Sequence, residues 1–559
     1  MYILGLNSYG HDSSVCLLKD GVPVFAACEE RFNRKKHYRG FPEMALRHCL
    51  REANISFEEI EYIGNFTNPG CLFPYGKHFT TMLGLSQLYL LPQKILEFSK
   101  SKERPRSIEL KVGNKRICFI DHHLTHAASS FFVSEFEEAA ILSVDSAGET
   151  VSTLMAKGSG NNIEIIKEID LPHSLGILYT AVTEYLGFRP MSDEGKVMGL
   201  APYGEPSYYD AFKNVINFER DGDYKLDMSY FSTSLDPEAT KYSEKFLAAF
   251  GPPRKPESEI TKRDQDIASS LQLVLEEGFL HLANYLHQVT GLKNLCLAGG
   301  VALNSVANGR VLKESPFEEI FIQPAASDAG CALGAAYYIY HTLLGKPRKF
   351  VMKDDFLGPA YQDEKIRRTL ERSGLAYEQK KNIFKIGAKL LSEGKIIGWF
   401  CSRMEFGPRA LGARSILADP RDKKMKDKLN LKVKHREGFR PFAPSILEEK
   451  VSDWFDLDYP SPFMLLVYDV LPRMREKVPA ITHVDGTARV QTVSRKANPG
   501  YYQLISEFEN LTGVPLILNT SFNVRGEPIV CSPQDAINCF RKTEMDYLII
   551  EDYLVCKSP

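Results

Sequence analysis

A buried-type strand runs directly into a pair of glycines at Asn294-Leu295-Cys296-Leu297-Ala298-Gly299-Gly300-Val301-Ala302-Leu303-Asn304. Glycines allow a ligand to approach the backbone closely, and the N-terminus of the helix that follows attracts phosphate. We therefore expect Gly299, Gly300 and Asn304 to bind a nucleotide cofactor.

A second apolar segment, 320–322, is followed by a similar transition. Pro324 and then the small-residue run 327–336 predict a strand that leads into a tightly packed helix start. Asp328 lies at that start, so we expect its carboxylate to face the same nucleotide-binding cleft as Gly299 and Gly300.

The chain contains two copies of one pattern: a strand, an acidic glycine loop, a second strand, a turn and a third strand. Asp12 lies in the first loop, and Asp145 and Gly148 lie in the second. The predicted strands are 2–6, 13–18 and 22–28 in one copy, and 139–144, 151–156 and 163–169 in the other. This duplication predicts an actin-like ATPase (ASKHA) fold, whose two lobes hold a nucleotide between their facing loops. Lys196, in the segment 193–200, is a further candidate for cofactor binding, and the segment 205–262 is typical of an insertion over the cleft.

The basic, proline-containing joint 345–349 predicts a domain boundary. We expect an α/β protein with an N-terminal domain over 1–350 and a C-terminal domain over 351–559. The second domain opens with a predicted helix at 383–393 and a strand at 396–400.

Composition excludes several classes of function. The chain has 559 residues and a formal net charge of −2 from 69 basic and 71 acidic side chains, which argues against general binding to nucleic acid or membranes. Its eleven cysteines never form a Cys-x-x-Cys pair, as is typical of a reducing compartment. No apolar run reaches the roughly 18 to 20 residues that cross a bilayer, and the first residues predict a strand without a basic leader. We expect a cytoplasmic protein.

The motif Asp121-His122-His123-Leu124-Thr125-His126 predicts a metal site. If Asp121 caps a helix here, His122 and His126 lie one turn apart on one face, as two imidazoles need to hold one ion. The duplicated fold brings Asp145 and Asp328 to the same cleft, and mixed nitrogen and oxygen ligands suit Fe²⁺, Mn²⁺ or Zn²⁺. Alternatively, the carboxylates hold Mg-ATP and the histidines are hydrogen-bonded core residues.

His11 lies beside Asp12 in the first loop. A histidine oriented by a carboxylate works as a general base near neutral pH, although a loop histidine bonded to backbone is an equally good interpretation.

Basic residues gather between 403 and 440. Arg409 and Arg414 alternate with glycine, proline and apolar residues, which favours a pocket for phosphate or carboxylate groups. The lysines at 423–428 are typical of a solvated face. Nucleic acid is disfavoured because no aromatic platforms are interleaved.

The runs 406–412, 440–444 and 519–523, together with 299–304, resemble those of the O-carbamoyltransferases of the NodU/CmcH/TobZ type. The resemblance extends over essentially the whole chain. It implies an N-terminal domain like the actin-fold metalloprotein of tRNA threonylcarbamoyl-adenosine synthesis, and a C-terminal YrdC-like twisted α/β sheet domain.

The resemblance also implies roles for individual residues. His122, His126, Asp145 and Asp328 match the family's metal ligands, with Fe²⁺ as the first choice and Mn²⁺ or Zn²⁺ as alternatives. His11, with Asp12, matches the histidine of the transfer step. The YrdC-like pocket would contain Lys434, Arg436, Arg440, Arg489, Ser521 and Asn523.

The implied reaction makes carbamoyl-adenylate from carbamoyl phosphate and ATP with Mg²⁺, and transfers the carbamoyl group to a hydroxyl of a small natural product. A shielded path for this labile intermediate is expected. Two alternatives are threonylcarbamoyl transfer to tRNA and a non-catalytic nucleotide sensor of the actin fold. No nucleic-acid or membrane partner is expected, and a homodimer is left open.

Overall fold

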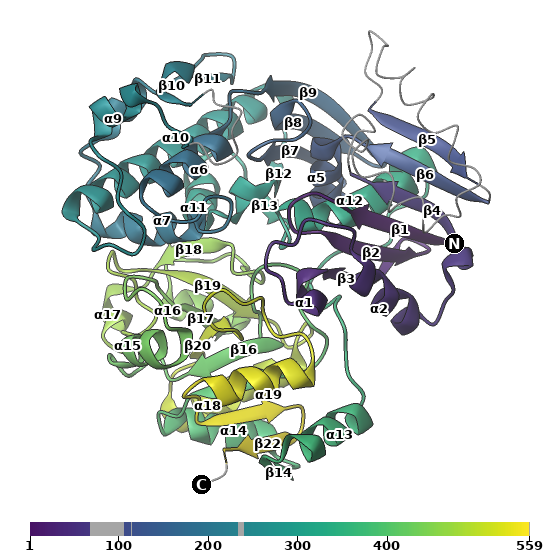
Figure 1. Ribbon diagram of the computed structural model, residues 1–559, viewed down its shortest axis with the longest axis vertical. Helices are drawn as coiled ribbons and strands as arrows, with labels where there is room; N and C mark the ends of the chain where they lie inside the picture. Colours follow the sequence, from purple (N-terminus) through teal and green to yellow (C-terminus); the bar gives the residue numbers. More distant parts are fainter. Residues whose placement is uncertain (67–105, 113, 233–239, 558–559) are drawn as a thin grey trace. The chain divides into compact units, whose positions relative to one another are not determined.

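The computed structural model describes residues 1–66, 106–112, 114–232 and 240–557, and the chain forms two compact units (Figure 1). The first unit contains Met1–Glu29 and His37–Met352. The second contains Glu30–Lys36 and Lys353–Pro559. The short helix α1 (Glu30–Asn33) therefore belongs to the second unit.

Two sheets of matching topology form the centre of the first unit. The first has the order β3-β2-β1-β4-β6-β5, and the second has the order β13-β12-β7-β8-β9. In each sheet a three-stranded antiparallel meander continues through its first strand into two parallel neighbours. This confirms the predicted duplication. The bounds are β1 (Tyr2–Asn7), β2 (Ser14–Lys19), β3 (Val22–Cys28), β4 (Ile60–Asn65), β5 (Ser107–Val112), β6 (Lys115–Ile120), β7 (Glu138–Val144), β8 (Val151–Ser159), β9 (Asn162–Asp170), β12 (Asn294–Ala298) and β13 (Glu319–Ile322).

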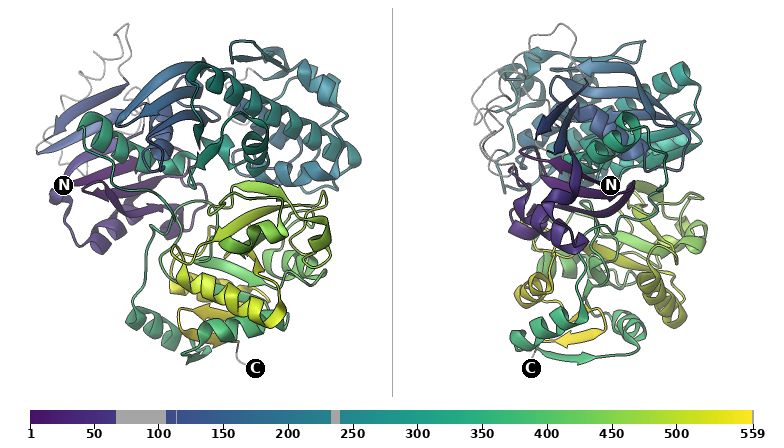
Figure 2. Two further views of the ribbon diagram at one scale, coloured as in Figure 1. Left: turned by 180° about the vertical axis from the view of Figure 1, so that it is seen from behind. Right: turned by 90° about the vertical axis from the view of Figure 1, so that its right-hand side faces the viewer.

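Two helices lie between the sheets. Helix α12 (Cys331–Tyr337) packs on β1 and β2, helix α5 (His122–Phe131) packs on β7 and β12, and the helices pack against each other (Figures 1 and 2). The packing needs glycine: a Cβ on Gly5 would lie 1.8 Å from the carbonyl oxygen of Ala332, and a Cβ on Gly334 would lie 1.8 Å from that of Thr125. The small residues predicted at 327–336 thus bring backbone against backbone at the centre of the unit.

The remaining helices of the first unit gather mainly around the long helix α10 (Lys262–Thr290), which contacts α6, α7, α8 and α11. The segment 205–262 folds into short elements, although residues 233–239 lie outside the described part of the chain. The remaining α-helices and strands of the first unit are α2 (Glu43–Ala53), α6 (Leu175–Tyr185), α7 (Glu194–Leu200), α8 (Tyr209–Lys213), β10 (Ile216–Phe218), β11 (Tyr224–Leu226), α9 (Glu244–Phe250) and α11 (Ser305–Glu314).

The second unit is built on a nine-stranded mixed sheet of order β14-β22-β21-β15-β16-β20-β17-β19-β18. Pairs β15–β21 and β17–β19 are parallel, and the other neighbours are antiparallel. The strands are β14 (Ala376–Gln379), β15 (Ile397–Phe400), β16 (Arg414–Ala418), β17 (Ala443–Leu447), β18 (Leu466–Asp469), β19 (Thr487–Val493), β20 (Leu516–Ser521), β21 (Tyr547–Ile550) and β22 (Tyr553–Cys556). The helices are α13 (Asp363–Ser373), α14 (Ile383–Ser392), α15 (Met425–Leu429), α16 (Val451–Trp454), α17 (Pro472–Arg475), α18 (Pro499–Thr512) and α19 (Pro533–Lys542).

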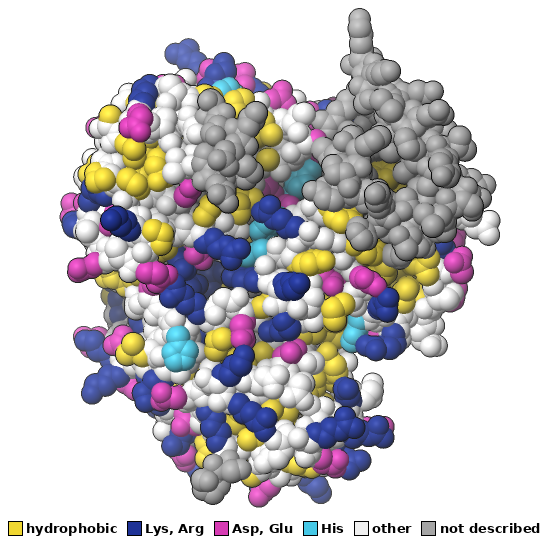
Figure 3. All heavy atoms as spheres, viewed as in Figure 1, with side chains coloured by type: hydrophobic (Ala, Val, Ile, Leu, Met, Phe, Trp, Pro, Cys, Tyr) yellow, Lys and Arg dark blue, Asp and Glu magenta, His cyan; other side chains and the backbone are white. Residues whose placement is uncertain are grey.

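Basic and acidic side chains are both distributed over the face drawn in Figure 3, in line with the small net charge. Within the described residues, no helix combines the length and apolar character that crossing a membrane requires.

Candidate functional site

Helix α5 begins at His122 with Asp121 at its N-cap position, as the motif predicts, but the side chain of Asp121 does not cap the helix. The side chain of Asp121 makes no capping hydrogen bond and instead lies 3.3 Å from the guanidinium of Arg106. The backbone N–H of His122 points to the carboxylate of Glu149, at 3.3 and 3.4 Å. A carboxylate from the second glycine loop thus takes the position at the positive end of the helix, where it is electrostatically favoured.

The four predicted metal ligands lie together and form what we term the histidine–aspartate cluster: His122, His126, Asp145 and Asp328. The two imidazole Nε2 atoms are 3.1 Å apart, and Asp145 Oδ2 is 2.9 Å from Nε2 of His126. The remaining nitrogen–oxygen separations are 3.7 to 3.8 Å. Two ligands at about 2.1 Å from one ion are about 3.0 to 3.4 Å apart at 90 to 109° and at most about 4.2 Å apart. All these separations therefore fit one shared ion.

The electrostatics of the cluster favour positive charge. Burial alone would lower the pKa of His122, yet the neighbouring Cys331 and the two carboxylates outweigh burial and raise it to about 9. Burial would raise the pKa of Asp145, but the two histidines hold it well below its usual range. Carboxylates packed against imidazoles in this way attract either protons or a metal ion.

The middle histidine of the motif has a different role. His123 Nε2 lies 3.0 Å from the carbonyl oxygen of Val151, which requires a donor there, so Nδ1 accepts from Ser143 Oγ at 2.9 Å. Burial lowers the pKa of His123, which keeps the ring neutral. This residue holds α5 against the second sheet.

The predicted cofactor-binding glycines pack around the cluster. Gly148 lies against the start of α5, where a Cβ would be 3.0 Å from His123 Cδ2. Gly299 has φ +87°, and a Cβ there would be 2.2 Å from the carbonyl oxygen of Val144. Gly300 donates its N–H to Asp145 Oδ2 at 3.1 Å. The glycine loop therefore supports a candidate metal ligand.

The other two cofactor-binding candidates of this unit make internal contacts. Asn304 caps α11 by accepting from the N–H of Ala307 at 3.0 Å, and its amide also bonds Gln272. Lys196 is buried on α7, with Nζ 3.0 Å from Asp193 Oδ2. Neither belongs to the histidine–aspartate cluster.

His11 and Asp12 form a separate group with His37, which the sequence interpretation missed. Asp12 lies between two histidines, 3.1 Å from His11 Nδ1 and 2.8 Å from His37 Nδ1. The outer nitrogen of His11 is 2.9 Å from the carbonyl oxygen of Met191. Burial would lower the pKa of His11, but Asp12 outweighs burial and raises it to about 9. Both nitrogens thus face acceptors, and the ring holds both of its protons at neutral pH in this arrangement, with the backbone contact that the second interpretation of His11 expects.

One side chain links this group to the metal ligands. The amide of Asn7 donates to the backbone carbonyls of His11, Asp12 and Asp328, at 2.8, 3.1 and 3.0 Å. The first glycine loop is therefore tied to the turn that presents Asp328.

In the second unit, five of the predicted cationic residues come together as a basic cluster: Arg409, Lys434, Arg436, Arg440 and Arg489. Burial and the neighbouring Arg440 lower the pKa of Arg409 to about 10 and that of Arg436 to about 9. Burial and the three other arginines hold the pKa of Arg489 well below its usual range. Its buried Nε has no hydrogen-bond partner among the described residues. Cations so placed repel one another, and an anionic ligand would relieve both the repulsion and the lost hydration.

Lys434 joins the basic cluster to the Ser-x-Asn motif. Its Nζ donates to the carbonyl of Ser521 at 2.7 Å, and to the carbonyl and side-chain oxygens of Asn523 at 2.9 and 2.7 Å. Burial, with Arg436 and Arg440 nearby, lowers the pKa of Lys434. The predicted proximity of these three motif residues is therefore observed.

Arg414 lies apart from the basic cluster. It is fully buried, stacks 3.6 Å from the ring centroid of Phe400, and donates to backbone carbonyls including that of Cys401 at 3.2 Å. Its neighbour in the loop, Glu405, accepts from the N–H groups of Leu411, Ala413 and Arg414 at 2.8, 2.7 and 3.1 Å. Arg414 and Glu405 thus hold the loop that presents Arg409.

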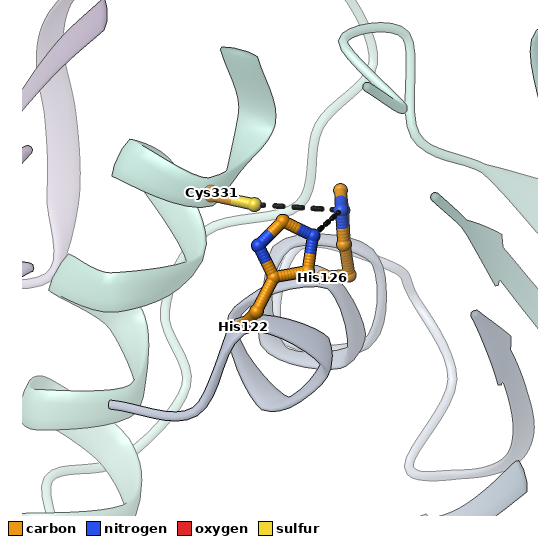
Figure 4. A group of neighbouring side chains, drawn as sticks. All are labelled: His122, His126 and Cys331. Carbon is orange, nitrogen blue, oxygen red and sulfur yellow. Dashed lines mark hydrogen bonds between the residues drawn. The ribbon is translucent and has the colours of Figure 1, made fainter. Parts of the chain in front are cut away.

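Three residues of these sites were not predicted from the sequence, because each acts through a contact between distant segments. Glu149 lies within the predicted second glycine loop, and its acidity was a usable signal. Cys331 lies three residues after Asp328 and places Sγ 3.5 Å from His126 Nε2 (Figure 4). His37 had no local motif to mark it.

One α/β unit thus holds a largely buried histidine–carboxylate cluster, and the other holds converging, mostly half-buried cations that suit an anionic ligand. The chain belongs to the carbamoyltransferase family: residues 2–71 and 77–337 match the carbamoyltransferase N-terminus, and residues 388–557 match the carbamoyltransferase C-terminus.

Relatives match over the whole chain. The uncharacterized protein sll1178 of Synechocystis sp. is 44% identical and covers 100% of this chain and 97% of its own length. The nodulation protein NolNO of Sinorhizobium fredii is 38% identical, over 99% of this chain and 80% of its own length. Among solved structures, component A of the (R)-2-hydroxyglutaryl-CoA dehydratase of Acidaminococcus fermentans aligns at 15% identity and a TM-score of 0.33, covering 60% of this chain and 97% of that one.

Proposed function

We propose that this protein is an ATP-dependent O-carbamoyltransferase that runs two reactions. The second unit, with a YrdC-like role, makes carbamoyl-adenylate from carbamoyl phosphate and Mg-ATP. The first unit then transfers the carbamoyl group to a hydroxyl of a small natural product of the antibiotic or toxin type. Membership of the carbamoyltransferase family supports the reaction class.

The observation that carries the proposal is the basic cluster. Carbamoyl phosphate and ATP are both polyanions, so they approach each other only where cations offset their repulsion. Arg409, Lys434, Arg436 and Arg489 already lie close to one another in a poorly hydrated environment beside the half-exposed Arg440, as the lowered pKa values of these four groups indicate. Because they are fixed before the ligands bind, little reorganisation is needed during the reaction.

Adenylation takes place in two steps. Water cleaves carbamoyl phosphate to carbamate and inorganic phosphate, and a carbamate oxygen then attacks the α-phosphorus of ATP. The bond from that phosphorus to the β-phosphate bridge breaks and pyrophosphate leaves. The poor electrophile carbamate thereby gains AMP as a leaving group.

In the transfer step the acceptor hydroxyl attacks the carbonyl carbon and AMP leaves with the bonding electrons. A divalent transition ion bound by the histidine–aspartate cluster would supply a Lewis acid for phosphate oxygens. His11 is placed to take the hydroxyl proton at Nε2, once that nitrogen gives up its proton and its contact with Met191. Asp12 fixes the ring through Nδ1.

The test is pyrophosphate release from carbamoyl phosphate and Mg-ATP. Replacing Arg440 or Ser521 by alanine should reduce the rate at least about a hundredfold, because each change removes a group from the basic cluster or its motif. Lys423→Ala, a change of an exposed cation in the same unit, is the matched control and should leave the rate unchanged.

Loss of pyrophosphate release in the Lys423 control, or full activity in Arg440→Ala, would contradict the assignment of adenylation to the basic cluster. Absence of pyrophosphate from the unmodified protein, with metal and varied acceptor alcohols present, would contradict the function itself.

A further inference from the structure

The thiol of Cys331 lies on the interior side of the histidine–aspartate cluster. Its Sγ is 3.5 Å from Nε2 and 3.6 Å from Nδ1 of His126 (Figure 4). The same Sγ lies within 4.8 Å of a ring nitrogen of His122 and of His126. Cys331 and His126 are fully buried, whereas the side chain of Asp328 is 17% exposed. Sulfur and nitrogen thus lie inward, and a carboxylate lies toward the open side.

The local backbone directs the sulfur there. Asp328–Gly330 forms a single 3-10 turn, and Cys331 follows it as the first residue of α12. Residues three apart on such a turn lie on the same side, so Asp328 and Cys331 both face helix α5, where each joins His122 and His126 in a separate group of possible ligands.

The separation between sulfur and nitrogen is that of two ligands of one ion. A thiolate at about 2.3 Å and an imidazole nitrogen at about 2.1 Å from a tetrahedral ion are about 3.6 Å apart. The observed 3.5 Å between Cys331 Sγ and His126 Nε2 matches this value.

Other buried cysteines do not share this arrangement. Cys16 and Cys296 are as deeply buried, but among the described residues neither joins a group of histidine, cysteine and carboxylate ligands close enough to hold an ion. The position of Cys331 is therefore more than the ordinary burial of a small apolar side chain.

We propose that Cys331 supplies a thiolate ligand to the ion held by His122 and His126. The inference rests on the metal centre of the proposed function. On binding, the thiol proton is released to solvent and sulfur takes its place in the coordination sphere beside the imidazoles. A thiolate favours borderline ions such as Fe²⁺, Co²⁺ and Zn²⁺ and disfavours Mg²⁺. The sulfur therefore keeps the Mg²⁺ that accompanies ATP out of this site.

Cobalt substitution of the full-length protein tests the proposal. The Co²⁺ form should bind one ion and show a near-ultraviolet thiolate-to-cobalt charge-transfer band. Cys331→Ser should lose that band and bind Co²⁺ at least about tenfold more weakly, while its affinity for Mn²⁺ changes little. Cys16→Ser, with an equally buried thiol outside the cluster, is the matched control and should retain the band.

X-ray absorption of the unmodified zinc form tests the proposal without any variant. It should show one sulfur at about 2.3 Å from the ion. One bound ion without a charge-transfer band or sulfur scatterer would overturn the inference and leave a metal centre of histidine and aspartate. A band that persists in Cys331→Ser would overturn it as well. No bound ion at all would overturn both the inference and the metal centre, but adenylation would still be judged separately by pyrophosphate release.

Discussion

At the scale of single residues, the proposed transfer step depends on the proton of His11. Its Nδ1 faces the carboxylate of Asp12 and its Nε2 faces the carbonyl of Met191, so both nitrogens donate in this arrangement. Asp12 outweighs the effect of burial and raises the pKa of His11 to about 9. A base with this pKa is strong, but at neutral pH it is mostly protonated and cannot accept a further proton.

The rate of carbamoyl transfer should therefore increase with pH up to about 9, about tenfold per unit, because only the neutral ring accepts the hydroxyl proton. Asp12→Asn removes the charge that raises the pKa, so the inflection should move down toward the ordinary value of 6.5. Transfer is followed by mass spectrometry of the carbamoylated alcohol, with pyrophosphate release measured in parallel as the reference step. A transfer rate that falls as pH rises through this range would mean that the protonated ring is the active form.

At the scale of elements, the pair α5 and α12 determines the geometry of the candidate metal site. Helix α5 presents His122 and His126, and the turn before α12 presents Asp328 and Cys331. The pair approaches closely because Gly334 places no side chain against the backbone of Thr125. Helix packing and ligand geometry are therefore coupled.

Gly334→Ala should lower the free energy of unfolding by about 3 kcal/mol, since its Cβ would overlap the carbonyl oxygen of Thr125. It should also weaken Co²⁺ binding by separating the two helices. Gly195→Ala is the matched control: this glycine lies in α7 with nothing within 4 Å of a Cβ, so alanine should be neutral or stabilising by roughly 0.5 to 1 kcal/mol. Denaturant unfolding measures both changes, and equal stability of the two variants would contradict the packing argument.

Local patterns predicted the elements well, because strand alternation and glycine loops are encoded by neighbouring residues. The strand 294–298 and the helix beginning at His122 are observed as expected. Asp121 lies at the N-cap position of that helix, but the carboxylate that faces the first N–H belongs to Glu149 in another loop. The burial of Arg414 against Phe400 depends on tertiary packing, which no spacing of arginines in the sequence reveals.

At the scale of the whole molecule, the histidine–aspartate cluster and the basic cluster belong to different units, but the units do not coincide with halves of the sequence. Residues 30–36 belong to the second unit, where Arg31 donates to the carbonyl of Gly407 at 2.8 Å and Arg34 donates to that of Pro528 at 2.7 Å. The C-terminal half alone therefore lacks part of its own unit. Variants of the full chain are the right means to separate the two steps.

The most direct measurement is mass spectrometry of quenched reactions that contain isotope-labelled carbamoyl phosphate and Mg-ATP. His11→Ala should still release pyrophosphate and accumulate the labelled carbamoyl-adenylate, whereas Arg440→Ala should form neither. Loss of the adenylate and of pyrophosphate in both variants would mean that the two residues serve one step, and the division of labour between the units would be wrong.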